Sequence, residues 1–124
     1  LDKAYAIEEA NGVAAGRVVV QGSQPGRARL PEGPMADAIL GVTTHSQSLP
    51  GANVAVRKAG IARVVAAGPI PVGAPVCVAD DEGRVMRCNP GIGEATPCLG
   101  FAETSAADAG DIVEVFIALH QRSA

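Results

Sequence analysis

The residues that could do chemistry in this chain are few and far apart. The chain has two histidines: His45 lies in the polar segment TTHSQS, and His120 follows the last apolar run. Ser46 and His120 could in principle form a Ser–His pair, but no serine lies in the G-x-S-x-G pattern that marks a nucleophile. We therefore expect solvated histidines and predict no catalytic residue and no enzyme. A hydrolase that uses His45 or a cysteine stays open as an alternative, besides the two functions considered at the end of this section.

Three cysteines, Cys77, Cys88 and Cys98, follow one another at spacings of 11 and 10 residues. An odd number does not favour a disulfide framework, and no C-x-x-C pair indicates a zinc site. We expect small, partly buried thiols in a reducing compartment, and we predict no metal site. Cys77 and Cys88 flank the turn at 80–83 and could face one another across a hairpin.

Segments that could hold a cofactor do not match the known patterns. DDEGR at 80–84 lacks the alternating oxygen ligands of a calcium loop. NPGIGE at 89–94 is not a G-x-G-x-x-G motif, and G-x-x-x-x-G-K-[ST] does not occur in the chain. We predict that the protein uses no cofactor.

The composition limits the class of partner. The chain has 124 residues and a formal net charge of −3, with acidic and basic residues well mixed, which argues against binding to nucleic acid. No apolar run approaches the roughly 20 residues that span a bilayer, so we expect no membrane partner. Hydrophobic residues make up 48% of the chain but aromatic residues only 2%. A core of small side chains makes burial at a subunit interface attractive.

Glycine, proline, asparagine and aspartate interrupt the chain at short intervals, a pattern typical of an all-β barrel or sandwich. No run of a dozen residues keeps an apolar period of 3.6, so helices should be few and short. The strands are expected at 17–21, 28–30, 38–43, 53–57, 61–66, 75–79, 84–87, 98–103 and 112–119.

Glycines recur at nearly constant spacing along the two halves of the chain. The first two pairs are 57 residues apart and the next two are 59 apart, as one two-residue insertion would produce. The pairs are Gly16 with Gly73, Gly26 with Gly83, Gly41 with Gly100, and Gly51 with Gly110. We interpret them as structural turn glycines, because the corners of small barrels require positive φ or close backbone approach.

This repeat predicts two four-strand units, at 16–57 and 73–119, which close on one another into one small barrel or sandwich. A bridge at 58–72 would carry one extra strand. The whole of 16–124 would be a single β domain. Residues 1–15 show no alternation and are expected to be an irregular N-terminal arm.

The repeated sequence segments also resemble the head decoration, or capsid cement, proteins of tailed bacteriophages. The resemblance covers roughly residues 14–119. It is carried by ILGVT with GANVAVRKAGIARVVA, by IPVGAPV with DEGRV, and by LGFAETSA with AGDIVEV. The cysteines match nothing in the family pattern.

The resemblance implies a structural protein of the virion that forms a homotrimer on the outer capsid surface. There it clamps major capsid protein subunits, after a period in the host cytoplasm during assembly. In such families the N-terminal arm often becomes ordered on the capsid. The arm residues expected to bind are Leu1, Asp2, Lys3, Tyr5 and Ile7. Deletion of 1–14 should then weaken binding to the shell while leaving the barrel folded.

A small-molecule or carbohydrate-binding β-barrel accessory module is the alternative, because AGIARVVAAGPIPVGAPV is also similar to β-clip segments of such modules. That function requires a pocket with converging polar groups, usually with aromatic side chains. The chain offers only Tyr5, Phe101 and Phe116 as aromatic residues.

Overall fold

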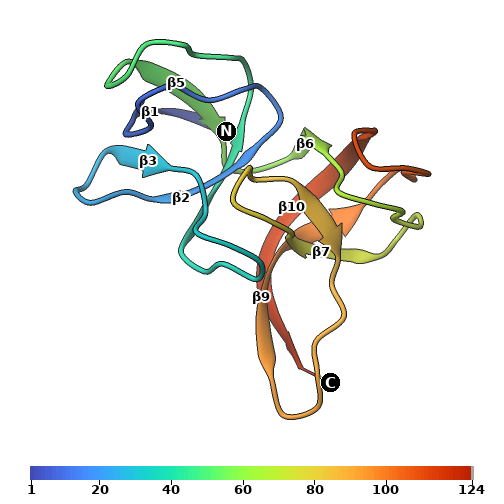
Figure 1. Ribbon diagram of the computed structural model, residues 1–124. Helices are drawn as coiled ribbons and strands as arrows, with labels where there is room; N and C mark the ends of the chain where they lie inside the picture. Colours follow the sequence, from blue (N-terminus) through green and yellow to red (C-terminus); the bar gives the residue numbers. More distant parts are fainter. Residues whose placement is uncertain (124) are drawn as a thin grey trace.

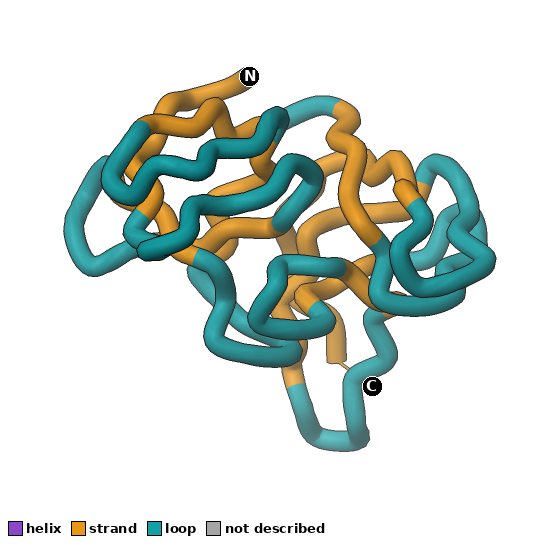
Figure 2. Tube along the Cα trace, turned by 45° about the horizontal axis from the view of Figure 1, so that its top comes forward, coloured by secondary structure: helices purple, strands orange, loops and turns teal. Residues whose placement is uncertain are grey.

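The computed structural model describes residues 1–123; position 124, the last of the predicted domain, lies outside the described residues. All regular structure in 1–123 is β-strand, as Figure 2 shows, so the predicted all-β fold is confirmed. In this range no helix is long and apolar enough to cross a membrane. The strands are β1 (Asp2–Ile7), β2 (Val18–Gln21), β3 (Arg27–Arg29), β4 (Ile39–Thr43), β5 (Asn53–Arg57), β6 (Ile61–Val65), β7 (Pro75–Val78), β8 (Val85–Arg87), β9 (Ala95–Ala102) and β10 (Ile112–Ser123).

The strands form two sheets, one from each half of the chain (Figure 1). The first is a closed barrel with the order β1-β3-β2-β4-β5, and the second is a five-stranded sheet with the order β6-β10-β9-β7-β8. The expectation that two units share one barrel is therefore wrong. Each half pairs its own strands, and we call residues 1–57 the first unit and residues 60–123 the second unit.

Strand β1 corrects the prediction of an irregular arm. It pairs with β5 along five positions, from Asp2 opposite Arg57 to Ala6 opposite Asn53, and it also pairs with β3. Tyr5 and Ile7 point into the barrel and are almost completely buried. Burial of two large apolar side chains makes this segment an integral strand, so its deletion would open the barrel.

The pairing registers show that each unit has five strands rather than four. Asp2 lies opposite Arg57 in β1 and β5, and Ile61 lies opposite Phe116 in β6 and β10, with both residues 59 positions further on. The extra strand predicted in the bridge is β6, and it is the counterpart of β1. Short contacts repeat in the same way, because the isolated bridge of Val13 with Gln47 has its counterpart in Ile70 with Ala106.

Gly41 and Gly100 lie inside strands β4 and β9 rather than at turns. A Cβ atom on Gly41 would overlap the carbonyl oxygen of Arg57, and one on Gly100 would overlap that of Phe116. The same close crossing of two strands therefore occurs at the same place in both units. Only glycine permits it, because any side chain would push the paired strands apart.

The residues at the start of β2 replace one of the hydrogen bonds that would close the second unit, where Ala66, the residue after β6, keeps a single parallel bridge with Val85 of β8. In the first unit, the N–H of Ala6 donates to the carbonyl of Gly26 at 3.0 Å and helps close the barrel. The equivalent groups of the second unit are the N–H of Val65 and the carbonyl of Gly83. They bond instead to the first unit, because Val65 donates to Gly16 at 2.9 Å and Gly83 accepts from Val18 at 2.8 Å.

Residues 16–18 therefore act as a wedge that occupies the opening between β6 and the turn before β8. The side chains of Val18 and Val42 belong to the first unit but pack in the buried core of the second, together with Val64, Leu99 and Val115. The first unit keeps its own smaller core around Tyr5, Ile7 and Val56. The two units are thus joined by backbone hydrogen bonds and by shared apolar burial.

Candidate interaction surfaces

The structure does not assemble the histidines into a catalytic site. His45 lies in an exposed loop of the first unit, where its Nε2 accepts from the N–H of Ala55 at 3.3 Å. His120 lies on β10 of the second unit, where its ring stacks on Phe101 with centroids 4.8 Å apart. The Ser46 hydroxyl accepts from the N–H of Ala15, and within residues 1–123 no hydrogen bond joins it to His120.

The three cysteines form one buried cluster of free thiols in the second unit. The sulfur atoms of Cys98 and Cys88 are 3.1 Å apart. Burial raises the pKa of Cys77 and of Cys98 to about 12, so both remain protonated at neutral pH. In the first unit, Val20 is the counterpart of Cys77 and Ile39 that of Cys98, so the thiols occupy places that aliphatic side chains fill elsewhere in the same chain.

Thiols bind soft metal ions and acidic side chains bind hard ones, so a metal site would require a cluster of such side chains. No group of three or more His, Cys, Asp or Glu side chains among residues 1–123 is placed to hold a metal ion.

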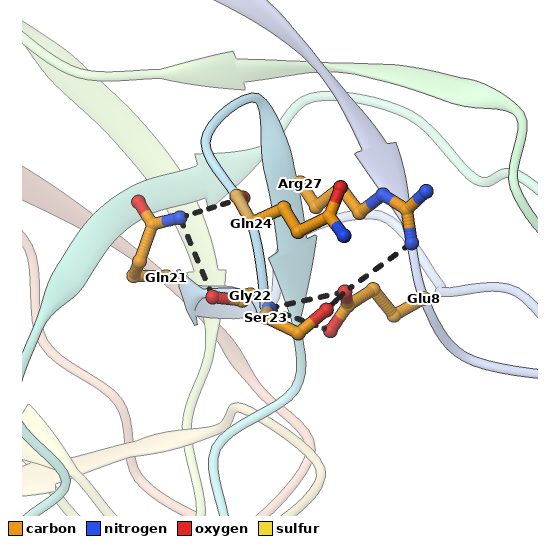
Figure 3. Close-up of polar contacts among 6 residues, drawn as sticks. All are labelled: Glu8, Gln21, Gly22, Ser23, Gln24 and Arg27. Atoms are coloured by element: carbon orange, nitrogen blue, oxygen red, sulfur yellow. Dashed lines mark hydrogen bonds and ion pairs between the residues drawn. The ribbon is translucent and has the colours of Figure 1, made fainter.

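The densest polar cluster fastens the end of β1 to the turn between β2 and β3 (Figure 3). The carboxylate of Glu8 accepts hydrogen bonds from the hydroxyl and the N–H of Ser23, and Arg27 approaches it at 3.9 Å. These bonds from Ser23 hold the pKa of Glu8 below its usual value, which makes the carboxylate a weaker base. Gln21 braces the same turn through the carbonyl of Gln24 at 2.9 Å. The cluster is suited to holding a corner of the barrel rather than to catalysis.

A hollow between the two units is the place to look for a ligand pocket. Its lining includes Gly16, Thr43 and Arg57 of the first unit and Arg63 and Ile112 of the second. Arg57 is already engaged by the carboxylate of Asp2 at 3.0 Å. None of the three aromatic residues lines it, so the hollow lacks the aromatic wall expected of a carbohydrate-binding module.

A partly exposed apolar row crosses four neighbouring strands of the second unit. Directly opposite residues of a sheet share one face, and here Ile61 on β6 lies opposite Phe116 on β10, which lies opposite Phe101 on β9, which lies opposite Pro75 on β7. Ile61 is 46% exposed and Phe116 is 48% exposed. We call these four residues the apolar row; it contains both phenylalanines of the chain.

The same four positions of the first unit have a different character. They are Asp2, Arg57, Val42 and Val18, again in register across neighbouring strands. Val18 and Val42 are buried by the second unit. Asp2 and Arg57, at the other end, are partly exposed and form an ion pair, in which the hydrogen bond from Arg57 lowers the pKa of Asp2.

A hairpin protrudes from the second unit and carries a second exposed apolar feature. Strands β9 and β10 continue past a register shift between Ile117 and His120 and pair as far as Ala95 with Ser123. Figures 1 and 2 show this hairpin and the loop before β9 extending away from the rest of the molecule, beside the C-terminus. In that loop Ile92 is 98% exposed. We call residues 88–98 together with 118–123 the protruding hairpin.

The corresponding loop of the first unit, between β3 and β4, instead lies against the second unit. The N–H of Met35 donates to the carbonyl of Val78 at 2.9 Å, and Ala36 and Ile39 pack on the second core. Sequence reasoning missed both surfaces. The signal was present in the repeat, where Ile61 and Phe116 align with a charged pair and where Ile92 is a bulky residue in a loop of glycines.

Comparison with known proteins gives this architecture a family. The model of the phage cement protein family matches residues 3–117, which include strands of both units from β1 to β10. The chain belongs to the phage cement protein family. The predicted resemblance to head decoration or cement proteins is therefore confirmed. No match is found among curated proteins.

A solved structure of similar fold comes from a bacteriophage head. It is the crystal structure of the head fiber gp8.5 N base in bacteriophage phi29, with a TM-score of 0.68 and 16% sequence identity. The match covers 95% of this chain and 93% of that chain. At this identity the likeness shows a shared fold, extending over both units of the phage cement chain.

Proposed function

We propose that the protein decorates the outer surface of an assembled phage head as a homotrimer and stabilises the head by clamping neighbouring major capsid subunits. The observation that carries the proposal is membership of the phage cement family across residues 3–117. The proposed role is structural, without catalysis, and places the protein on the virion after assembly in the host cytoplasm.

The physical mechanism is linkage. A protein that binds only the assembled shell stabilises it by about 2.7 kcal/mol per site when its free concentration is 100 times the dissociation constant. A trimer that contacts several capsid subunits together converts weak single contacts into tight overall binding, because the second and third contacts are intramolecular.

The protruding hairpin is our candidate for the capsid contact. The paired ends of β9 and β10 support the loop between β8 and β9, in which Ile92 offers an almost fully exposed side chain. Leu1 and Lys3, exposed at the start of β1, are a second candidate contact. Tyr5 and Ile7 are excluded as contacts because they fill the first core.

The test is to mix purified protein with undecorated, expanded heads and to measure the amount of protein that sediments with them. We expect saturable binding in multiples of three copies at each three-fold position, and we expect Ile92→Ser to weaken it. Leu49→Ser is the matched control, because Leu49 is 63% exposed on the first unit. Absence of binding by the wild-type protein contradicts the proposed function. Equal binding by the Ile92→Ser variant contradicts only the hairpin contact.

A further inference from the structure

We propose that the apolar row of Ile61, Phe116, Phe101 and Pro75 is the surface that binds a second copy of this chain. The inference rests on the homotrimer of the proposed function and names the face that holds it together. In the trimer, each row would contact the neighbouring copies around the three-fold axis.

The first argument is the fate of the same face in the first unit. There the β2 and β4 ends of the row, Val18 and Val42, are covered by the second unit, which has the same five-strand fold. The molecule thus shows that a copy of this fold can cover this face. Where that cover stops, the first unit carries the ion pair of Asp2 and Arg57. The second unit carries Ile61 and Phe116 at those two positions. Exposure of these two large apolar side chains to water is unfavourable.

The second argument is that Pro75 cannot make the backbone hydrogen bond through which Val18 joins the second unit. Val18 joins the second unit by donating its N–H to Gly83. Its counterpart is Pro75, which has no N–H to donate. A second copy also offers no free acceptor of this kind, because Gly26 already accepts from Ala6 within the closed barrel. A second copy therefore cannot repeat this backbone contact, and it would meet the row through side chains.

The third argument concerns charge and composition around the row. Arg63 and Glu114 lie opposite one another on β6 and β10, next to Ile61 and Phe116, so the row is flanked by one charge of each sign. A second row would therefore meet no excess of like charge. Aromatic side chains are the residues that most often dominate binding energy at interfaces, and both phenylalanines of the chain lie here.

The structure itself supplies the variant that tests this inference. The double substitution Ile61→Asp with Phe116→Arg places in the second unit the ion pair that Asp2 and Arg57 form at the same register in the first. The fold tolerates that pair there, so the variant should stay folded. We expect the wild-type protein to associate in sedimentation equilibrium without any heads present. Loss of one anchor side chain should weaken association by about 30-fold, and loss of both should leave monomer at micromolar concentration.

Leu49→Ser serves as the control for loss of an exposed apolar side chain elsewhere, and it should associate like the wild type. If the double variant fails to fold, the single Phe116→Ser variant at a half-exposed position carries the test, with the same expected 30-fold loss. Wild-type protein that stays monomeric at all concentrations overturns the inference. A folded variant that associates as tightly as the wild type also overturns it.

Failure here and failure of the proposed function are distinguishable. Association that depends on the row, without any binding to heads, supports this inference and contradicts the capsid role. A monomeric wild type whose binding to heads is lost in the double variant would show that the row contacts the capsid, which overturns self-association and supports the capsid role.

Discussion

Gly26 and Gly83 occupy the same turn position in the two units and offer a direct test of the wedge at residues 16–18. Both have positive φ, 82° and 76°. Nothing lies within 4 Å of a Cβ placed on Gly26, whereas a Cβ on Gly83 would overlap the carbonyl oxygen of Val18 and lie 3.0 Å from its nitrogen. Alanine at either position is strained, but only at Gly83 does it also displace the first unit.

The expected magnitudes follow from these contacts. A left-handed alanine costs about 1–2 kcal/mol, offset by about 0.4–1 kcal/mol from the stiffer unfolded chain, so Gly26→Ala should cost about 1 kcal/mol. Gly83→Ala has the same strain. It also loses the hydrogen bond from Val18, which leaves buried groups unpaired at about 1–3 kcal/mol, and it adds a steric cost of about 1–3 kcal/mol. Its total should be about 3–7 kcal/mol.

The assay is thermal unfolding followed by circular dichroism, with urea unfolding as an independent measure of the free energy. At roughly 4 °C per kcal/mol for a chain of this size, Gly26→Ala should lower Tm by about 4 °C and Gly83→Ala by about 12–28 °C. Equal losses of stability in the two variants would refute the reasoning, because they would show that the first unit makes no contribution at Gly83.

Three further predictions concern the fold. Deletion of residues 1–8 should unfold the first unit and expose its core to a hydrophobic dye, because the barrel loses a strand paired on both sides and two buried side chains; a variant that binds no more dye than the wild type would contradict this. Gly100→Ala should cost about 3–5 kcal/mol in urea unfolding, since the new Cβ displaces the carbonyl of Phe116, and a loss below about 1 kcal/mol would show that β9 and β10 can separate freely. Stability should fall as pH rises from about 9 towards 12, because the folded thiols of Cys77 and Cys98 have their pKa raised to about 12 and stay protonated while those of the unfolded chain ionise; a Tm unchanged between pH 8 and pH 10.5 would contradict it.

Nine of the ten strands could be predicted from the sequence because their ends are marked by turn residues and their apolar positions alternate or run together. Strand β1 could not. Its sequence, DKAYAI, has only two large apolar residues, Tyr5 and Ile7, separated by Ala6, and Ala4 before them adds no contrast. The strand exists because β5, some fifty residues away, supplies its partner along five positions. Local propensity cannot report such a long-range pairing.

The difference between a closed barrel and an open sheet was also beyond sequence reasoning. Both units have a glycine followed by arginine at the same turn, Gly26-Arg27 and Gly83-Arg84. In the second unit the parallel bridge of Ala66 with Val85 remains, but the N–H of Val65 bonds to the carbonyl of Gly16 in the first unit and not to that of Gly83. Backbone hydrogen bonds of this kind carry no side-chain signature.

Equivalent surfaces of the two units have different surroundings: those of the first unit contact the second unit, and those of the second unit face solvent. The first unit directs Val18, Val42 and the loop of Met35 against the second unit, so these surfaces serve the molecule's own assembly. Within residues 1–123 nothing covers the corresponding face of the second unit, and yet the residues at the equivalent positions are not polar. Phe116 and Ile92 remain in water at the positions where a solitary protein would be expected to carry charge. The two units share one fold. Where equivalent positions of the two units carry different kinds of residue, we infer that the surroundings of those positions differ. Because the charged pair of the first unit shows that this fold accepts a polar solution at the row, its apolar replacement in the second unit is best explained by a partner that excludes water from it.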